Sequence, residues 1–435
     1  MTASLFFTDT FSRDSIIFSA PIASRAARSF AFFLLLSASG IFATQAAFAQ
    51  ASAFSTKPPA AESSAQDFNT LSAQAAQASQ QNRLDDATAL YRKALILRPR
   101  WAEGWWSLGT LQYDQNHFSE AARAFQKLIV LQPENGTAHA MLGLCQSELR
   151  QYDDSLKNLL LAQRQGVQND AQLQHVVLYQ LGTAQLRKRR FGDALATFTL
   201  LLKDNVRSPE VETAMGMGVL TIAPADLPAA GTPGRDVVER VGRAESLAAF
   251  KEFATAKPLY EMVVNEYPAY PNLHYAFGRF LLAAHETDQA IAEFQREIAN
   301  NPKHVGAMLQ IAAVRYRVDS AAGVQYALQA VHTEPQLPFA HYLLGLLYLD
   351  TDRAAEALTE LEIARKAFPQ QAQVYFALGN AYARVGQKEQ SARMRAQFVR
   401  LNSAKPQETG ADVYGEQPSG LVNQKLGESA EKPKP

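Results

Sequence analysis

Histidine, cysteine and acidic side chains could carry chemistry in this sequence, but they are widely separated. The eight histidines are scattered singly along the chain, and no His-Glu-x-x-His sequence or cysteine pair occurs. A nucleophile, a base and an orienting group must lie within hydrogen-bonding reach, and metal ligands need a defined spacing. We therefore expect no catalytic residues, no metal site and no cofactor, and predict that the chain is not an enzyme.

Other isolated features have simple structural interpretations. Cys145 is the single cysteine, and it falls in a helical pattern typical of a small buried side chain. His274 and His341 each precede a glycine by four residues, which predicts a shared repeat position on helix surfaces. The basic run 187–190 falls between two predicted helices and favours a solvated turn over a nucleic-acid site. The stretch 231–236 lacks the spacing and the closing Lys-Ser/Thr of a phosphate-binding loop.

The charge balance and composition bound the class of protein. Lys+Arg and Asp+Glu both number 42, and 47% of the residues are hydrophobic. A neutral chain offers no long-range attraction for nucleic acid or an anionic membrane surface, whereas this hydrophobic content can form a buried core. We expect a folded protein that has no nucleic-acid partner and chooses its partners through local surface patches.

An internal repeat of 34 residues is the strongest signal in the chain. Alanine, aromatic and proline positions recur at this period, as in the pairs Ala87 and Ala121, Tyr91 and Phe125, and Pro99 and Pro133. A small residue lets two helices approach closely, and an aromatic ring fills the space between hairpins. Proline ends a helix because it lacks the backbone N–H donor that a continuing helix would use. The repeat therefore predicts stacked helical hairpins.

These residues resemble the tetratricopeptide repeat, in which Trp-x2-Leu-Gly opens the first helix and an alanine, an aromatic and a proline follow. The closest copy begins at Trp105 and ends at Pro133, with Gly109, Ala121 and Phe125 at the expected places. The resemblance implies an all-α fold, a right-handed superhelical solenoid of about ten helical hairpins. The units would start near residues 68, 102, 136, 175, 209, 237, 271, 305, 338 and 372.

The fifth unit interrupts this pattern. Its first helix runs into the Gly/Pro-rich stretch 223–234, where a second helix should be. Because a missing helix leaves an unfilled stacking position, we predict an N-terminal array over 67–222 and a C-terminal array over 235–402. A surface insertion within one continuous superhelix is the alternative. Residues 50–66 and 403–435 contain few large apolar groups and are predicted to be a disordered linker and tail.

Residues 1–49 are predicted to be an export signal. Arg25 and Arg28 precede an apolar run, and Ala47 and Ala49 provide small side chains at the cleavage positions. We expect cleavage after Ala49 and an exported protein, periplasmic or secreted. Retention of the segment as an uncleaved anchor is the alternative.

In the tetratricopeptide repeat the first helix of each hairpin lines a concave groove. The resemblance places an aromatic row and polar neighbours in that groove: Trp106, Tyr113, Tyr179, Tyr275, Arg279, Tyr316, Tyr342, Phe376, Asn380 and Arg384. Aromatic rings can hold partner side chains, while Arg and Asn donate hydrogen bonds to carbonyls or carboxylates. For some of these rings, packing between adjacent first helices is the alternative.

The predicted function is that of an exported scaffold that binds peptide segments or envelope proteins in its groove. Such a scaffold could join a membrane-associated assembly through a partner. Aromatic rows also stack on sugars, and tetratricopeptide arrays occur in polysaccharide-export systems. A glycan-interacting or polysaccharide-export accessory module is therefore the alternative. The oligomeric state is not predicted.

Overall fold

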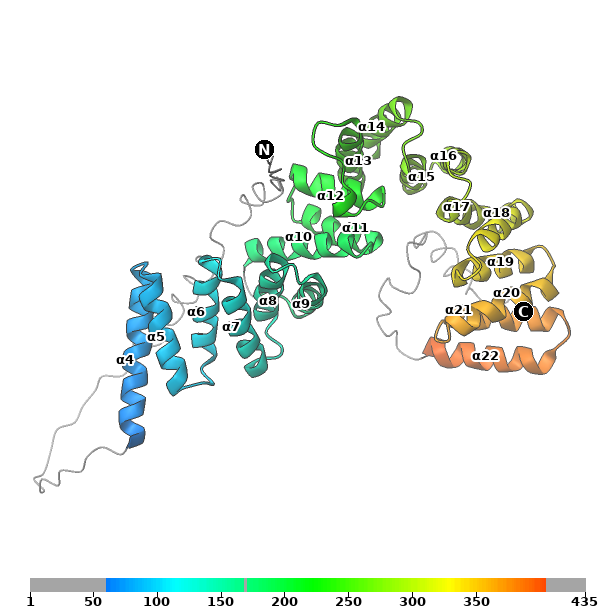
Figure 1. The fold of residues 1–435 in the computed structure, drawn as a ribbon. Helices are drawn as coiled ribbons and strands as arrows, with labels where there is room; N and C mark the ends of the chain where they lie inside the picture. Colours follow the sequence, from blue (N-terminus) through cyan, green and yellow to red (C-terminus); the bar gives the residue numbers. More distant parts are fainter. Residues whose placement is uncertain (1–59, 168–169, 404–435) are drawn as a thin grey trace, which may run out of the picture. The chain divides into compact units, whose positions relative to one another are not determined.

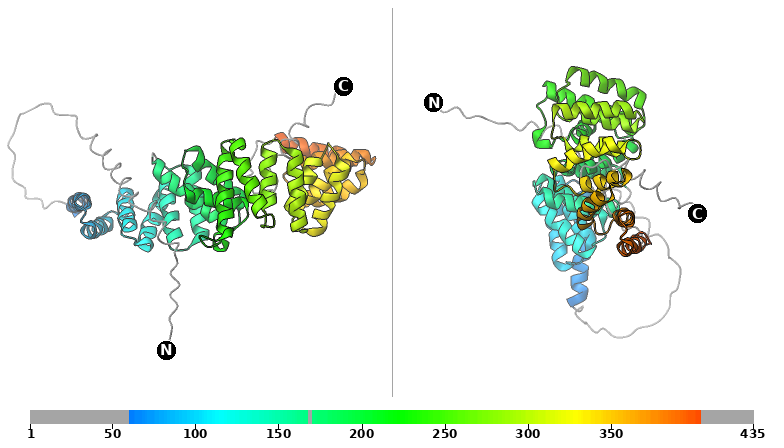
Figure 2. Two further views of the ribbon diagram at one scale, coloured as in Figure 1. Left: turned by 90° about the horizontal axis from the view of Figure 1, so that it is seen from above. Right: turned by 90° about the vertical axis from the view of Figure 1, so that its right-hand side faces the viewer.

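The computed structural model describes residues 60–167 and 170–403, and this part of the chain is built from helices without strands. Consecutive helices pack side by side as hairpins (Figures 1 and 2). In chain order they are α4 (Ala60–Gln80), α5 (Leu84–Leu97), α6 (Ala102–Asp114), α7 (Phe118–Leu131), α8 (Gly136–Glu148), α9 (Tyr152–Gln165), α10 (Ala171–Arg187), α11 (Phe191–Lys203), α12 (Pro209–Val219), the 3-10 helix η1 (Pro224–Asp226), α13 (Pro233–Ala249), α14 (Phe253–Glu266), α15 (Leu273–Ala283), α16 (Thr287–Asn300), α17 (Val305–Arg315), α18 (Ser320–Thr333), α19 (Pro338–Asp350), α20 (Ala354–Ala367), α21 (Ala372–Arg384) and α22 (Lys388–Ser403).

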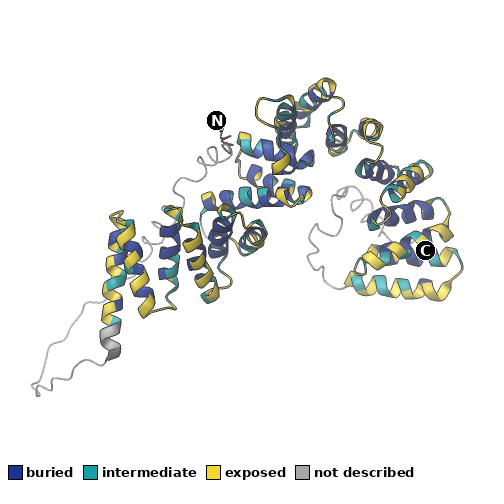
Figure 3. Cartoon of the chain, in the orientation of Figure 1, coloured by how far each residue is buried: buried dark blue, intermediate teal, exposed yellow. Residues whose placement is uncertain are grey.

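Internal contacts divide the chain into two compact units between Ala184 and Gln185, inside α10. Each unit has its own apolar core, seen as the dark inner faces of the helices in Figure 3. In the first unit, Phe125 and Leu159 are fully buried in this core. In the second unit, Leu344 and Leu361 are fully buried. The repeated apolar pattern is therefore used to bury one face of every hairpin.

The glycines of the repeat allow close packing inside a hairpin. A Cβ atom built on Gly109 of α6 would lie 2.8 Å from the ring of Phe125 in α7. One built on Gly278 of α15 would lie 2.5 Å from the ring of Phe294 in α16. A larger residue at either place would push the two helices apart. The expected close approach at the glycine is confirmed, and the aromatic ring packs against the glycine of its own hairpin.

Most hairpin turns contain one residue in the left-handed conformation, two positions before the second helix. These residues have positive φ angles and are Asn82, Asn116, Arg150, Arg189, Lys251, His285, Asp352 and Gly386. Only glycine, and to a lesser degree asparagine, adopts this conformation at low cost. The varied residue types show that stacking of the two helices holds these turns in place.

The packing of α12 corrects one prediction. The second helix expected after α12 is indeed replaced by η1 and a loop, but no stacking position is left open, because α13 packs along α12. A Cβ atom on Gly216 would lie 2.0 Å from the Val238 carbonyl oxygen, and one on Gly242 would lie 1.8 Å from the Glu212 carbonyl oxygen. This backbone contact joins the segments on either side of 223–234, so the two compact units do not divide at that loop.

The predicted boundaries agree with the helices at most units. Helices α6, α8, α12, α17, α19 and α21 start at the expected residues. Helix α4, however, begins at Ala60, inside the segment 50–66 that was expected to be disordered. The predicted signal 1–49 and the tail beyond Ser403 lie outside the described residues. Over the described ranges, no helix is both long and apolar enough to cross a membrane.

Candidate partner-binding surface on the first helices

Three tyrosines of the predicted aromatic row are buried, which corrects their assignment to an open groove. Tyr275, Tyr316 and Tyr342 are 6%, 8% and 2% exposed. The Tyr275 ring lies 5.8 Å from that of Phe294 and 4.6 Å from that of His304, between centroids. The alternative of packing between helices therefore holds for these three rings, because neighbouring helices cover them.

Four of the predicted groove residues in the second unit are accessible. Phe376 of α21 is 39% exposed, Arg279 of α15 and Arg384 of α21 are exposed, and Asn380 is half-buried. Phe376, Asn380 and Arg384 follow one another at four-residue spacing, so they lie along one face of α21. Helix α21 is the first helix of the final hairpin in the described part of the chain. No later hairpin covers Phe376 there.

The side chains on this face of α21 have different surroundings. The Phe376 ring lies 5.3 Å from the ring of Phe398 in α22. Arg384 donates from Nη1 to the carbonyl oxygen of Leu349 and, at 3.1 Å, to the Asp352 carboxylate. Because the Asp352 side chain is 95% exposed, this ion pair is solvated and contributes little to stability. The guanidinium is therefore held by one backbone acceptor and one solvent-exposed carboxylate.

The predicted residues of the first unit are half-buried. The ring of Trp106 in α6 lies 5.7 Å from that of Phe125, and the ring of Tyr113 lies 5.4 Å from that of Phe118. Burial raises the pKa of the Tyr113 hydroxyl well above its usual value. Tyr179 of α10 is also half-buried. Within the described residues the buried Nε1 of Trp106 has no hydrogen-bond partner.

A hydrogen bond from a side-chain ring to a proline carbonyl connects successive hairpins. In each case the ring is on a first helix and the proline lies six residues earlier, in the turn that ends the preceding hairpin. The five pairs are Trp105 with Pro99, His139 with Pro133, His274 with Pro268, His341 with Pro335, and Tyr375 with Pro369, at 2.8 to 3.0 Å. We call this contact the ring-to-proline bond.

This contact corrects the prediction for two histidines. His274 and His341 are buried rather than on helix surfaces. The Nδ1 atom of His274 lies 2.6 Å from the Glu293 carboxylate, and that of His341 lies 2.5 Å from the Glu360 carboxylate. Both ring nitrogens thus face oxygen acceptors, and the imidazole joins a second helix to the preceding turn. The sequence showed the equivalence of the two histidines but not this role.

A second polar network surrounds the start of α15. The Glu297 carboxylate, 1% exposed, accepts hydrogen bonds from the backbone N–H of Asn272 and of Tyr275, at 3.2 and 3.1 Å. The Asn272 side-chain amide donates to the carbonyl oxygen of Leu220 at 3.0 Å, at the end of α12. The Asn272 side-chain oxygen accepts from Nε2 of His304 at 3.1 Å. Glu297 thus satisfies N–H groups that the helix itself leaves unpaired.

His304 is held in its neutral form at the start of α17. Its Nδ1 atom accepts a hydrogen bond from the backbone N–H of Ala307 at 3.0 Å, so this nitrogen carries no proton. Burial lowers the pKa of His304 below its usual value of 6.5, although the nearby Glu297 carboxylate acts in the opposite direction. The imidazole therefore caps α17 as a hydrogen-bond acceptor.

The other groups that could carry chemistry are used structurally. Cys145 is fully buried, and burial raises the pKa of its thiol to about 12, which suppresses the reactive thiolate. The basic run spans the end of α10 and the turn before α11, where Arg189 pairs with Asp226 at 3.0 Å. In the part of the chain that the structure describes, no group of three or more His, Cys, Asp or Glu side chains is arranged to hold a metal ion.

A comparison with known protein families agrees with this architecture. A tetratricopeptide-repeat family model matches residues 107–169 and 342–393. The solved structure titled "Crystal structure of MamA" is 16% identical and covers 37% of this chain and 94% of its own, with a TM-score of 0.35. Another, "MamA MSR-1 C2", is 17% identical and covers 38% and 95%, with a TM-score of 0.34. No curated protein matches the sequence.

The two matched segments lie in different compact units. Residues 107–169 include α7, α8 and α9 of the first unit, and residues 342–393 include α20 and α21 of the second. In both segments a first-helix glycine packs against a large apolar residue of the second helix, and a ring-to-proline bond joins neighbouring hairpins. The helical hairpins of both segments are therefore tetratricopeptide repeats, and the chain contains this repeat in both of its compact units.

Proposed function

We propose that this chain is an exported scaffold that binds a peptide segment or an envelope protein on its exposed first-helix residues and catalyses no reaction. Tetratricopeptide repeats form protein-interaction scaffolds, and this supports the general class of function. The observation that carries the finer proposal is the face of α21, where Phe376, Asn380 and Arg384 line up without being buried. We call these three residues the α21 face.

The three side chains suit an extended peptide. The Phe376 ring offers an apolar surface for a partner side chain, and the Asn380 amide can pair with a peptide backbone group. The Arg384 guanidinium can bind a carboxylate in a bidentate way. A rigid helix holds all three, so little conformational entropy is lost when the partner binds. The occupant that fits this chemistry is an extended segment with an apolar side chain and an acidic group.

Affinity capture from an envelope extract tests this proposal. The test variant combines Phe376→Ala with Asn380→Ala, and it leaves Arg384 in place because that side chain also bonds the backbone at the end of α19. The control combines Val399→Ala with Gln397→Ala, which removes one apolar group and one amide from α22 of the same hairpin. Thermal unfolding of both variants verifies that they are folded.

We expect a polypeptide that the unaltered chain and the α22 control capture equally and that the α21 variant loses. Equal recovery by all three chains would remove the α21 face from the proposal. Retention on a polysaccharide matrix that depends on Phe376 would instead support the glycan-interacting alternative.

Export is a separate part of the proposal, and it depends on the apolar segment near the amino terminus. We propose that residues 1–49 direct export and are removed after Ala49. Amino-terminal sequencing of the chain recovered from the envelope fraction should begin at Gln50. Recovery of the intact amino terminus from membranes would indicate an uncleaved anchor, and recovery only from the cytoplasm would contradict export.

A further inference from the structure

Two second helices of the first unit present a positively charged outer surface. After their first turns, α5 and α7 contain Arg92, Lys93, Arg123 and Lys127 but no Asp or Glu. All four residues are exposed, and none of them forms an ion pair or a side-chain hydrogen bond within the described residues. The equal totals of basic and acidic residues in the whole chain therefore conceal a local excess of positive charge on these two helices.

Strongly exposed aliphatic side chains lie beside these cations. Ile96 follows Lys93 by three residues, and Val130 follows Lys127 by three, so each pair lies on one side of its helix. Ile96 is 76% exposed and Val130 is 77% exposed. An open depression between α4 and α5 shows that the first pair is accessible from one place. The residues that border this depression are Lys93, Ile96, Leu97, Asp67, Thr70 and Leu71.

The two pairs point to the same side of the first unit. They occupy the same repeat position, because Lys93 and Lys127 are 34 residues apart, as are Ile96 and Val130. Helices α5 and α7 both pack against α6 (Figure 1). Stacking of one hairpin on the next repeats the direction of equivalent side chains. We define the basic face of the first unit as Arg92, Lys93, Ile96, Arg123, Lys127 and Val130.

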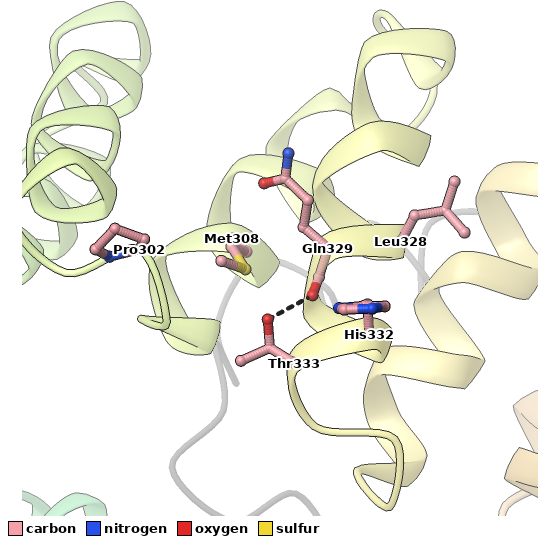
Figure 4. Close-up of a pocket in the computed structure, with 6 residues that line it drawn as sticks. All are labelled: Pro302, Met308, Leu328, Gln329, His332 and Thr333. Atoms are coloured by element: carbon pink, nitrogen blue, oxygen red, sulfur yellow. Dashed lines mark hydrogen bonds between the residues drawn. The ribbon is translucent and has the colours of Figure 1, made fainter.

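The second unit has a different arrangement at two comparable places. In α16 the positions equivalent to Lys127 and Val130 hold Arg296 and Ala299, and the Arg296 guanidinium pairs with the Glu293 carboxylate. Figure 4 shows an open depression between α17 and α18, and the residues that border it include no Lys or Arg: Pro302, Met308, Leu328, Gln329, His332 and Thr333. Neither place combines an unpaired cation with a strongly exposed aliphatic side chain.

This combination suits the surface of a lipid bilayer that contains anionic phospholipids. Lipid phosphates attract the cations, and each Lys or Arg near such a surface adds to the attraction. Aliphatic side chains beside the cations enter the boundary between headgroups and acyl chains, as in helices that lie on a membrane. An acidic polypeptide would pair with the cations, but its carboxylates would not take Ile96 and Val130 out of water. The apolar run near the amino terminus also precedes this unit in the sequence, so the proposed export route brings the first unit to a membrane.

We propose that the basic face of the first unit contacts the headgroup region of a bilayer with anionic phospholipids. Its four cations bind lipid phosphates, and Ile96 and Val130 enter the boundary with the acyl chains. The inference goes beyond the proposed function, which places polypeptide binding on the α21 face of the second unit. It assigns to the chain itself a membrane contact that the sequence suggested only through a partner.

A fluorescent label at position 130 tests this contact in the full chain. Val130→Cys carries an environment-sensitive fluorophore, and the native Cys145 does not compete for it, because burial raises the pKa of that thiol to about 12. The probe is a vesicle of phosphatidylcholine in which about one third of the lipid is phosphatidylglycerol. We expect a saturable rise in emission with a shift to shorter wavelength.

Two controls show whether this response is specific to the lipid charge and to the face. Vesicles of phosphatidylcholine alone should give a much smaller change. The same label at Val399→Cys in α22, a position that is 61% exposed, should respond to neither kind of vesicle. Because the label reports on its own surroundings, the comparison holds whether residues 1–49 are retained or removed.

Two double variants of the labelled chain separate local charge from total charge. Lys93→Gln with Lys127→Gln should raise the lipid concentration at half-saturation by roughly fivefold for each charge removed. Lys303→Gln with Lys388→Gln removes the same number of charges from exposed positions of the second unit and should leave this concentration unchanged. Thermal unfolding verifies that both variants are folded.

A pair of single variants tests the aliphatic part of the contact. Ile96→Ala should weaken the response by about threefold to tenfold, because less apolar surface leaves water at the bilayer. Leu328→Ala, at a position of the second unit that is 41% exposed, should have no effect. Equal responses of these two variants would overturn the entry of Ile96 into the bilayer.

Three results would overturn the proposal as a whole: no response to anionic vesicles, an equal response of the label at position 399, or an equal loss in both double variants. A response to poly-glutamate but not to vesicles would also overturn it and would assign the face to an acidic polypeptide.

The vesicles contain no polypeptide, so these outcomes are independent of the capture experiment. A chain that captures its polypeptide on the α21 face but does not respond to vesicles retains the proposed function and loses the membrane contact. A chain that responds to vesicles but captures no polypeptide contradicts the proposed function and retains the membrane contact.

Discussion

At the scale of single residues, polar side chains in this protein mostly join one helix to the next. Glu297 and His304 cap two helices, and the rings of His274 and His341 bond to the turn before their own helix. Such buried polar groups stabilise a fold only while their hydrogen bonds are complete, and removing one partner leaves the other unsatisfied. The contribution of each such residue to stability can therefore be tested by a single substitution.

His304 should make the stability of the protein depend on pH. Because burial lowers its folded-state pKa below 6.5, the unfolded chain binds a proton that the folded chain does not. The free energy of unfolding should therefore fall as the pH drops below about 6.5, until His304 is protonated in the folded state as well. The loss amounts to at most about 1.4 kcal/mol for each pH unit of that window.

The control for this prediction is His304→Asn, since asparagine can still accept the Ala307 N–H but does not titrate. Urea unfolding of both chains at pH 7.5 and pH 5.5 measures the effect. The unaltered chain should lose more stability on acidification than the variant. An equal loss would mean that His304 is not the responsible group.

The ring-to-proline bond can be tested by removing the ring from one hairpin. His341→Met should lower the free energy of unfolding by about 1–3 kcal/mol, because the Pro335 carbonyl and the Glu360 carboxylate both lose a donor. The same substitution at the exposed His332 should change it by less than about 0.5 kcal/mol. Chemical denaturation of the two variants gives both values, and equal effects would contradict a structural role for the bond.

At the scale of helices, the sequence predicted the repeat and its closely packed pairs but not the turns. The starts of α6, α19 and α21 followed from the repeat, because glycine, aromatic and proline recur within each unit. The left-handed residues of the hairpin turns include Arg, Lys, His and Asp, which carry no local signal for that conformation. The contact between α12 and α13 was also missed, since it crosses a loop that looked like a boundary.

The backbone contact between α12 and α13 has a direct test. Gly216→Ala and Gly242→Ala should each destabilise the protein by about 1–3 kcal/mol or more, because the added methyl group meets a carbonyl oxygen that cannot move away. Gly192→Ala in α11 meets nothing within 4 Å and should be neutral or stabilise by about 0.5–1 kcal/mol. Thermal unfolding distinguishes them. Unfolding temperatures unchanged by the first two substitutions would show that α13 does not lie directly on α12.

At the scale of the whole molecule, the repeat period predicted stacked helical hairpins, and the resemblance to the tetratricopeptide repeat implied an all-helical solenoid. Which surface stays accessible could not be predicted, because it depends on the neighbouring hairpins. Tyr275, Tyr342 and Phe376 occupy the same repeat position, yet the two tyrosines are buried and Phe376 is 39% exposed. The difference arises because no later hairpin covers α21 in the described residues. The candidate site is therefore smaller than the aromatic row that the sequence suggested.

The central claim is that the α21 face binds a polypeptide, and site-specific photocrosslinking in cells tests it most directly. A photoreactive phenylalanine derivative replaces Asn380 in one strain and Arg393, on α22 of the same hairpin, in another. The proposal predicts a discrete crosslinked polypeptide from position 380 and none from position 393. Crosslinks to the same polypeptide from both positions, or from neither, would contradict binding on the α21 face.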